Sequence, residues 1–292
     1  MAAVWYADKA SKRKSVSHIV RVNGDEGTPV PIPNTVVKLV YGDNTWLATA
    51  WEDNSTRTLT PVLSNRRFVL SKTMEENMYQ YILFDLDGTL TDSREGITKS
   101  VQYALGKMGI EETDLVALEH FIGPPLFDEF RRCYGFDEAQ AKQAVAAYRE
   151  RFSEVGWREN LLFDGISQLL AALQAAGKTL AIASSKPSVF IEKILDYFEI
   201  ASYFPVVSGA TLDGRIGTKT QVVRQALDLL GVTDLTQAVL VGDRMHDAEG
   251  AQACGIDCVG VTFGFGGEDE LRAAGLTKIA HDMQELQKLL MA

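Results

Sequence analysis

The stretch Tyr81–Leu90, YILFDLDGTL, constrains the fold of this chain more than any other. An apolar run leads into two carboxylates, Asp85 and Asp87, and then into Gly88, which is typical of a buried strand that ends in a turn. Side chains alternate along a strand, so acids two residues apart start out on the same side. Ligands of open α/β sheets bind beyond the carboxyl ends of strands. Asp-x-Asp-Gly also occurs in ordinary acidic turns, and this stretch alone leaves both interpretations open.

The composition is that of an ordinary globular protein, with 46% hydrophobic and 23% charged residues among 292. This length allows one large domain or two smaller ones. No stretch approaches the roughly 18–20 apolar residues of a transmembrane helix. Met1 to Lys14 lacks the apolar run and cleavage site of a secretory signal. We therefore expect a cytoplasmic protein that does not bind membranes.

Charge and cysteine content narrow the range of partners. The net charge of −10 disfavours sequence-independent nucleic-acid binding. Residues 1–77 carry a net charge of +2, and the remainder carries −12. Cys133, Cys254 and Cys258 form no even disulfide framework, so we expect free thiols in a reducing compartment. The spacing of Cys254 and Cys258 would suit a metal pair, but no second Cys/His pair is evident to complete it.

Residues 1–76 have the pattern of a separate small β-rich module. Trp5, Trp46 and Trp51 are expected to fill its core, although exposure to a partner is the alternative, and Lys12–Lys14 is expected to be a solvated basic run. Turn-forming residues separate short β-type runs, as in a small antiparallel sheet or barrel. The runs are Val16–Val22, Thr35–Tyr41, Thr45–Trp51, Arg57–Leu63 and Arg67–Leu70.

The polar segment Ser71–Met78 is the expected junction to a second domain. Within that domain, residues 96–160 show helical periodicity without a strand, which indicates an all-helical insert between 78–95 and 161–292. From Phe163 onward, apolar strands alternate with helices. That alternation predicts an α/β fold with a doubly wound parallel sheet. The expected strands are Thr179–Ala183, Phe204–Val207, Ala238–Val241 and Cys258–Val261.

Three of the predicted strands end in groups suited to phosphate and metal chemistry. Asp85 and Asp87 follow the first, Ser184 and Ser185 the second, and Asp243 with Asp247 the third; Lys219 opens a helix between the last two. The strand ends of a parallel sheet share one edge, so these groups should meet. Clustered carboxylates call for a divalent cation, and oxygen ligands suit Mg²⁺. A hydroxyl and an ammonium suit the oxygens of a phosphate.

The motifs Asp-Leu-Asp-Gly-Thr-Leu, Ser-Ser-Lys-Pro, Lys219 and Gly-Asp-Arg-Met-His-Asp, in this order, resemble the haloacid dehalogenase (HAD) superfamily. The resemblance covers about residues 78–292, and the Gly-Val-Thr-Phe-Gly-Phe-Gly segment at 260–266 is similar to the phosphoglycolate phosphatase-like and 5′-nucleotidase-like branch. It implies a HAD-like core with a mobile helical cap at 96–160. Residues 1–76 lie outside it.

The resemblance also implies a mechanism. Asp85 would attack phosphorus and form an aspartyl phosphate, while Asp87 would protonate the leaving oxygen and later activate water. Mg²⁺ would be held by Asp85, the main-chain carbonyl of Asp87, and Asp243. Ser184 and Lys219 would bind the phosphate, with Asp247 as a residue outside the direct metal ligands or as an orienter of Lys219. The remaining expectations are that amides of Leu86 and Ser185 complete the phosphate cradle, that Lys186 only covers a helix start, and that His246 lies on the solvent side of the mouth.

Hydrolysis of a small phosphate monoester, of the phosphoglycolate or nucleoside monophosphate type, is the expected activity. The carboxylate at Asp87 favours phosphoryl transfer over dehalogenation, and no motif marks a cap lysine for phosphonate hydrolysis. Arg131 and Arg132 are the leading substrate-selecting candidates, and Phe121, Phe127 or Tyr134 would suit a nucleotide. Two alternatives remain: a phosphatase docked to a protein or other partner through residues 1–76, with binding as the main role, and a sugar phosphomutase.

Overall fold

The structure, a computed structural model, describes residues 2–8, 19–22, 35–40, 46–52, 55–57 and 79–291. The chain divides into two compact units, Met1–Ser71 and Lys72–Ala292. The division falls inside the polar segment at which the sequence predicts a junction.

The first unit contains an antiparallel sheet in the order β2-β1-β3-β4-β5. Val37 pairs with Thr49 between its third and fourth strands, and Val4 pairs with Leu39 between its first and third. The strands are β1 (Ala2–Asp8), β2 (Ile19–Val22), β3 (Thr35–Val40), β4 (Trp46–Glu52) and β5 (Ser55–Arg57).

The sequence pattern anticipates β2, β3 and β4 but not β1. Alanine and aspartate have low β propensity, so AAVWYAD gives only a weak local signal for β1. Pairing with β2 on one edge and β3 on the other compensates for this weak signal. The predicted strand Arg67–Leu70, most of Arg57–Leu63 and the basic run Lys12–Lys14 lie outside the described residues. The roles of the three tryptophans stay predictions, because their side chains also lie outside the description.

The second unit is built on a six-stranded parallel sheet in the order β10-β9-β6-β11-β12-β13. The chain starts in the middle with β6, builds outward to β10, and returns to build β11, β12 and β13 on the other side. The change of direction lies between β6 and β11, where Phe84 pairs with Val241. A ligand crevice is expected at such a switch point. The strands are β6 (Tyr81–Phe84), β9 (Thr179–Pro187), β10 (Val206–Ala210), β11 (Ala238–Gly242), β12 (Asp257–Val261) and β13 (Ile279–Ala280).

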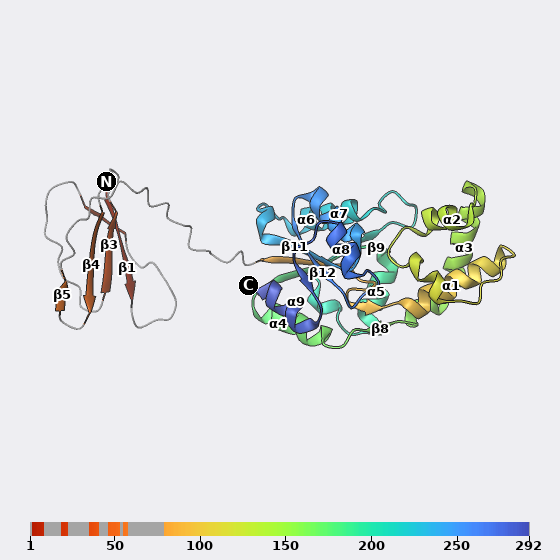
Figure 1. The fold of residues 1–292 in the computed structure, drawn as a ribbon, viewed down its shortest axis with the longest axis horizontal. Helices are drawn as coiled ribbons and strands as arrows, with labels where there is room; N and C mark the ends of the chain where they lie inside the picture. The colour runs from red at the N-terminus through yellow and green to blue at the C-terminus, as the bar shows by residue number, and fades with distance from the viewer. Residues whose placement is uncertain are drawn as a thin grey trace. The chain divides into compact units, whose positions relative to one another are not determined.

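Helices cover both faces of this sheet, so the fold is the predicted doubly wound α/β architecture (Figure 1). On one face, Ile82 and Phe84 pack with apolar residues of α4 (Ile166–Ala175), α5 (Ser188–Tyr197) and α9 (Met283–Met291). On the other, Leu83 packs with α6 (Lys219–Leu230) and α7 (Met245–Cys254). Alternate residues of β6 thus serve opposite cores, which explains why its sequence is apolar throughout.

The insert is helical, as predicted, and has its own core. Leu105, Phe121, Phe130 and Phe152 are buried in that core, which is separate from the two cores of the sheet. Figure 1 shows α1, α2 and α3 gathered beyond one end of the sheet. The insert, here called the cap, comprises α1 (Arg94–Lys107), η1 (Val116–Phe121), α2 (Leu126–Tyr134), α3 (Glu138–Glu154) and η2 (Gly156–Arg158).

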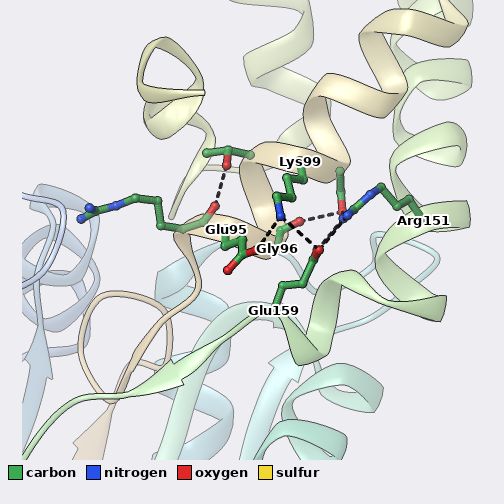
Figure 2. A network of polar contacts seen from close by, with 8 residues as sticks. Glu95, Gly96, Lys99, Arg151 and Glu159 are labelled. Carbon is green, nitrogen blue, oxygen red and sulfur yellow. Dashed lines mark hydrogen bonds and ion pairs between the residues drawn. The ribbon is translucent and has the colours of Figure 1, made fainter. Parts of the chain in front are cut away.

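The two chain crossings between cap and sheet domain lie side by side. β7 (Thr91–Asp92) pairs with β8 (Leu161–Leu162) in a two-stranded antiparallel ribbon. Just beyond it, Arg151 binds Glu159 through two bonds of 2.7 and 2.8 Å, and Lys99 contacts both Glu95 and Glu159 (Figure 2). Gly96 N–H also donates to Glu159 O. This network, here called the neck, holds the first and last residues of the cap together.

Several element boundaries differ from the sequence expectation. β9 continues through Pro187, so Ser184 and Lys186 belong to the strand, and α7 begins at Met245, which places Asp247 in a first helical turn. Leu115–Ile122 is mainly 3₁₀-helical. The sequence pattern does not predict β7, β8, β13, α8 (Glu268–Ala273), α9, η3 (Ala201–Tyr203) or η4 (Leu235–Gln237), most of which are too short for a periodic signal. Among the described residues, no helix is long and apolar enough to span a membrane.

Candidate active site

Asp85 and Asp87 lie directly beyond the carboxyl end of β6, at the switch point of the sheet. Asp85 N–H donates to Val241 O at 2.9 Å, which extends the sheet ladder up to the first acid. Gly88 then turns the chain with φ of +82°. A Cβ on Gly88 would lie 2.1 Å from Asp243 Oδ2, so the close approach, as well as the backbone angle, excludes other residues. The DxDG pattern therefore brings the acids of two strands together.

Lys219 is the cation at the centre of the acidic cluster. It begins α6 after the N-cap Thr218, and its Nζ lies 2.6 Å from Asp85 Oδ1 and 2.7 Å from Asp247 Oδ1. Nζ also donates to Ala183 O at 3.2 Å. Burial alone would lower the pKa of Lys219, but the two carboxylates outweigh burial and raise it. Lys219 is therefore a fixed positive charge beside Asp85.

Asp243 follows β11 and is completely buried. Its Oδ2 accepts a 2.7 Å hydrogen bond from Phe265 N–H, in the glycine-rich turn after β12. Burial, followed by the negative charges of Asp247 and Asp85, holds the pKa of Asp243 well above its usual value. Burial likewise raises the pKa of Asp247, with Lys219 opposing the shift and Asp85 adding to it. Both carboxyl groups thus lie where an additional positive charge would be stabilising.

The donor set fits a hard divalent cation. Asp85, Asp243 and Asp247 each offer an oxygen, and these three atoms lie within 4.8 Å of one another. Asp243 Oδ1 is buried and has no hydrogen-bond partner, which is costly unless a cation or water contacts it. Oxygen-only ligation by few carboxylates is what Mg²⁺ prefers. Asp87 is not part of this group of three, and its Oδ2 binds Lys186, so its main-chain carbonyl stays the predicted ligand.

Lys186 corrects the sequence interpretation. It was expected only to cover a helix start, but its side chain is 5% exposed and its Nζ lies 2.7 Å from Asp87 Oδ2. The ammonium also lies 4.8 Å from the centre of the Phe152 ring, which belongs to α3 of the cap. The alternation along β9 could have indicated this, since Lys186 is two residues from Ser184 and shares its side of the strand.

A small cavity of about 20 Å³ lies over these groups. Ser184 and Ser185 of β9 contribute to its wall, and their role as phosphate ligands stays a prediction. His246 lies at the mouth, with a side chain that is 40% exposed and 3.5 Å from Glu249. The lining residues are Asp85, Asp87, Gly123, Ser184, Ser185, Lys186, Lys219, Arg244, His246 and Asp247.

Arg244 joins the cap to the sheet domain above this cavity. Its Nη1 donates to Ile122 O of the cap at 2.8 Å, and its Nε donates to Glu270 Oε1 at 2.9 Å. Gly123, next to Ile122, is the one cap residue that lines the cavity. The sequence alone indicates no role for Arg244, because only the tertiary fold brings it against the cap.

The arginines proposed to select the substrate are elsewhere. Arg132 is exposed and binds Glu129 at 2.6 Å, and the Arg131 guanidinium lies 5.7 Å from the centre of the Phe127 ring; neither lines the cavity. Phe121 is buried in the cap core against Phe130. Arg131 and Arg132 therefore contact other residues of α2, and in this arrangement of the cap they do not reach the cavity.

The parallel sheet, the helical cap and the acidic cluster with its two buried lysines define a cap-bearing hydrolase of the α/β class. Residues 82–261 match the family model described as "Haloacid dehalogenase-like hydrolase". The chain belongs to this haloacid dehalogenase-like family, as the sequence motifs predict, and it is a phosphoric monoester hydrolase.

Curated relatives and solved structures agree with this family. A 5′-nucleotidase of Pseudomonas aeruginosa is 51% identical over 212 residues, covering 73% of this chain and 96% of the relative. The tyrosine-protein kinase PtkA of Mycobacterium tuberculosis is 43% identical over 204 residues, covering 69% of this chain and 68% of the relative. A phosphoglycolate phosphatase of Pseudomonas putida is 28% identical, covering 70% of this chain and 77% of the relative. The crystal structure of a predicted phosphatase from Clostridium acetobutylicum has a TM-score of 0.71 and 45% identity, covering 72% of this chain and 97% of that one.

Proposed function

We propose that this protein is a Mg²⁺-dependent phosphatase that cleaves small phosphate monoesters through an aspartyl phosphate on Asp85. The observation that carries the proposal is the division of the two acids of DxDG between two buried lysines. Asp85 contacts Lys219 at 2.6 Å, and Asp87 contacts Lys186 at 2.7 Å. Each acid is thus held by its own buried ammonium, which lets the two carboxylates occupy separate positions and perform two different tasks.

Asp85 is the nucleophile in this proposal. Lys219 binds one of its oxygens and fixes the carboxylate at the end of β6, so the other oxygen can attack phosphorus as the ester oxygen leaves. Lys219 then lies close to the transferring phosphoryl group and offsets its negative charge. The Ser184 hydroxyl and the Ser185 amide, at the cavity wall, are the proposed donors to the remaining phosphate oxygens.

Asp87 is the proposed acid and base. It gives a proton to the leaving oxygen in the first half of the cycle and takes one from the attacking water in the second. Lys186 keeps its carboxylate in position. Asp85, Asp243 and Asp247, with the main-chain carbonyl of Asp87, are the proposed groups around Mg²⁺, which when bound supplies positive charge to the phosphate oxygens.

The proposed substrates are compact phosphate esters, with nucleoside monophosphates first and phosphoglycolate second. The 5′-nucleotidase relative, 96% of which this chain covers, supports the nucleotide, and the phosphoglycolate phosphatase relative supports the second substrate. Arg244 and the neighbouring Gly123 stand at the cap side of the cavity, where the group beyond the phosphate would lie. The three unbridged cysteines support the proposed cytoplasmic setting.

The test compares wild type and Asp85→Asn with p-nitrophenyl phosphate and a panel of phosphorylated metabolites. Wild type should release phosphate only with Mg²⁺, and Asp85→Asn should show no turnover. Retained turnover in Asp85→Asn would overturn the assignment of the nucleophile. A sugar phosphomutase, the other catalytic possibility, would isomerise a sugar phosphate without releasing inorganic phosphate.

We propose that residues 78–95 and 161–292 form the catalytic core and that residues 96–160 form the cap. Residues 1–76 lie outside both, and we propose a separate binding role for them. The family match begins only at residue 82, and the first unit carries the opposite net charge from the rest. We propose that it docks the phosphatase to a protein or other partner. Deleting residues 1–76 should leave hydrolysis of p-nitrophenyl phosphate unchanged and abolish partner capture. The docking role is refuted if the isolated 1–76 segment neither folds nor binds and the intact chain captures the same proteins as the deletion.

A further inference from the structure

A second cluster of potential metal ligands lies in the cap, outside the phosphatase cavity. Among residues 79–291, His120, Glu129 and Cys133 offer one nitrogen, one oxygen and one sulfur within 4.8 Å of one another. His120 is in the last turn of η1, and Glu129 and Cys133 are one turn apart on α2. None of the three lines the cavity.

The three ligand atoms are spaced like three corners of a tetrahedron around one ion. Cys133 Sγ lies 3.1 Å from His120 Nε2 and 3.5 Å from Glu129 Oε2, and His120 Nε2 lies 4.0 Å from Glu129 Oε2. Zinc bonds of about 2.3 Å to sulfur and about 2.0–2.1 Å to nitrogen and oxygen give tetrahedral edges of roughly 3.3–3.6 Å. Side-chain shifts of a few tenths of an ångström would bring the three atoms onto those edges.

His120 is oriented for ligation by its other nitrogen. Nδ1 lies 2.7 Å from Ala117 O, and because a carbonyl only accepts, Nδ1 carries the proton. In the neutral ring this leaves the Nε2 lone pair facing Cys133. A backbone carbonyl that fixes the tautomer in this way is a usual partner of a metal-binding histidine. A simple surface hydrogen bond between a thiol and an imidazole would not need a carbonyl that fixes the tautomer.

Glu129 is anchored as well. Its side chain is 10% exposed, and Arg132 binds both of its oxygens, with Nη2 at 2.6 Å from Oε2 and Nε at 3.1 Å from Oε1. Oε2 also accepts from Arg132 Nε at 3.2 Å and from the Cys133 thiol at 3.5 Å, and a metal would replace the thiol proton at this oxygen. Cys133 is exposed and the His120 side chain is 34% exposed, so the fourth position faces solvent and is open to water.

We propose that His120, Glu129 and Cys133 bind a zinc-type divalent cation that clips η1 to α2. The mixed nitrogen, oxygen and sulfur set favours Zn²⁺ over Mg²⁺, which prefers oxygen ligands. The clip closes the segment from 120 to 133, which includes Ile122, the acceptor of Arg244, and Gly123 at the cavity. Its position means that the ion stabilises the part of the cap nearest the phosphate site. The proposal rests on the cap alone, independently of the proposed reaction.

The experiment uses Co²⁺ as a probe with the intact, chelator-treated protein in excess Mg²⁺. Cobalt bound to a thiolate gives a near-ultraviolet charge-transfer band, whereas cobalt among Asp85, Asp243 and Asp247 has no sulfur ligand and gives none. We expect one thiolate-bound Co²⁺ per chain, displaced by Zn²⁺. Cys133→Ser should lose the band, and His120→Ala should lose or greatly weaken it. Cys254→Ser and Cys258→Ser are the matched controls and should keep it.

Thermal unfolding supplies a second readout. Zn²⁺ should raise the Tm of wild type and of the two control variants but not that of Cys133→Ser, which must itself unfold cooperatively. No thiolate band in wild type, or a band that persists in Cys133→Ser, would overturn the site. So would an equal Zn²⁺-induced rise of Tm in wild type and Cys133→Ser.

Discussion

Lys186 Nζ lies 2.7 Å from Asp87 Oδ2, and the two side chains are 5% and 10% exposed. The same ammonium faces the Phe152 ring of the cap. An ion pair this well buried is costly to break from one side, because the remaining charge is left without a partner. Lys186 is therefore a positioning residue for the proposed acid–base group, and it links that group to the cap.

Lys186→Met is predicted to lower kcat about 10–100-fold, a part of the roughly 10²–10⁴-fold that acid–base catalysis contributes. Methionine keeps the apolar stem but leaves Asp87 without its cation. Lys186→Arg should recover part of the loss. Lys178→Met is the matched control, because Lys178 is also buried but donates to Tyr79 O at the opposite end of β9. Steady-state kinetics with p-nitrophenyl phosphate checks this, and an unchanged kcat in Lys186→Met would contradict it.

The stabilisation by Mg²⁺ is predicted to grow as the pH rises above about 4, the ordinary pKa of an aspartate. Burial and neighbouring carboxylates raise the pKa of Asp243 and Asp247. In the unfolded chain an aspartate ionises near about 3.9, so the metal-free folded state loses stability as the pH rises toward the raised pKa values. A bound cation favours the ionised form and reverses this loss.

Melting curves in chelator and in Mg²⁺ across that pH range measure the effect. The rise of Tm caused by Mg²⁺ should be larger at high pH than at low pH. Asp243→Asn, which removes one of the two titrating groups, should flatten the dependence. A rise of Tm that is the same at every pH would be incompatible with cation binding at these carboxyl groups.

Glu159→Gln is predicted to destabilise the neck of the cap. The carboxylate receives two bonds from Arg151 and one contact from Lys99, and both Arg151 and Glu159 are less than one-quarter exposed (Figure 2). Loss of charge-assisted bonds of this kind costs about 1.5–3 kcal/mol. Denaturant unfolding should show the loss, whereas Glu138→Gln, from the exposed Lys142 pair on α3, should leave stability unchanged. Equal effects of the two substitutions would refute a special role for the neck.

The catalytic strands could be read from the sequence because each combines an apolar run with a polar end. Phe84–Asp85, Ala183–Ser184 and Gly242–Asp243 all show this pattern, and parallel pairing brings their ends to one edge. The contact of Lys219 with Asp85 and Asp247 is also within reach of sequence reasoning, since a lysine at a helix start beside strand ends has few other positions to occupy.

What the sequence could not supply depends on contacts between the cap and the sheet domain. Lys186 faces Phe152, and Arg244 reaches Ile122, across sequence separations that no local pattern encodes. That Arg131 and Arg132 lie away from the cavity also could not be predicted, because the orientation of α2 follows from its packing against Phe121. His120 and Cys133 are 13 residues apart with a Gly-Pro-Pro turn between them, so their contact has no recognisable spacing.

The central claim, that Asp85 carries the phosphoryl group, is tested most directly by mapping the intermediate. Asp87→Asn should still be phosphorylated by p-nitrophenyl phosphate, since p-nitrophenolate leaves without a proton, but it should lack the base for the water step. Acid-quenched Asp87→Asn should therefore gain the mass of one phosphoryl group, located by peptide mass spectrometry on Asp85. A phosphoryl group on any other residue, such as Ser184, would contradict the account.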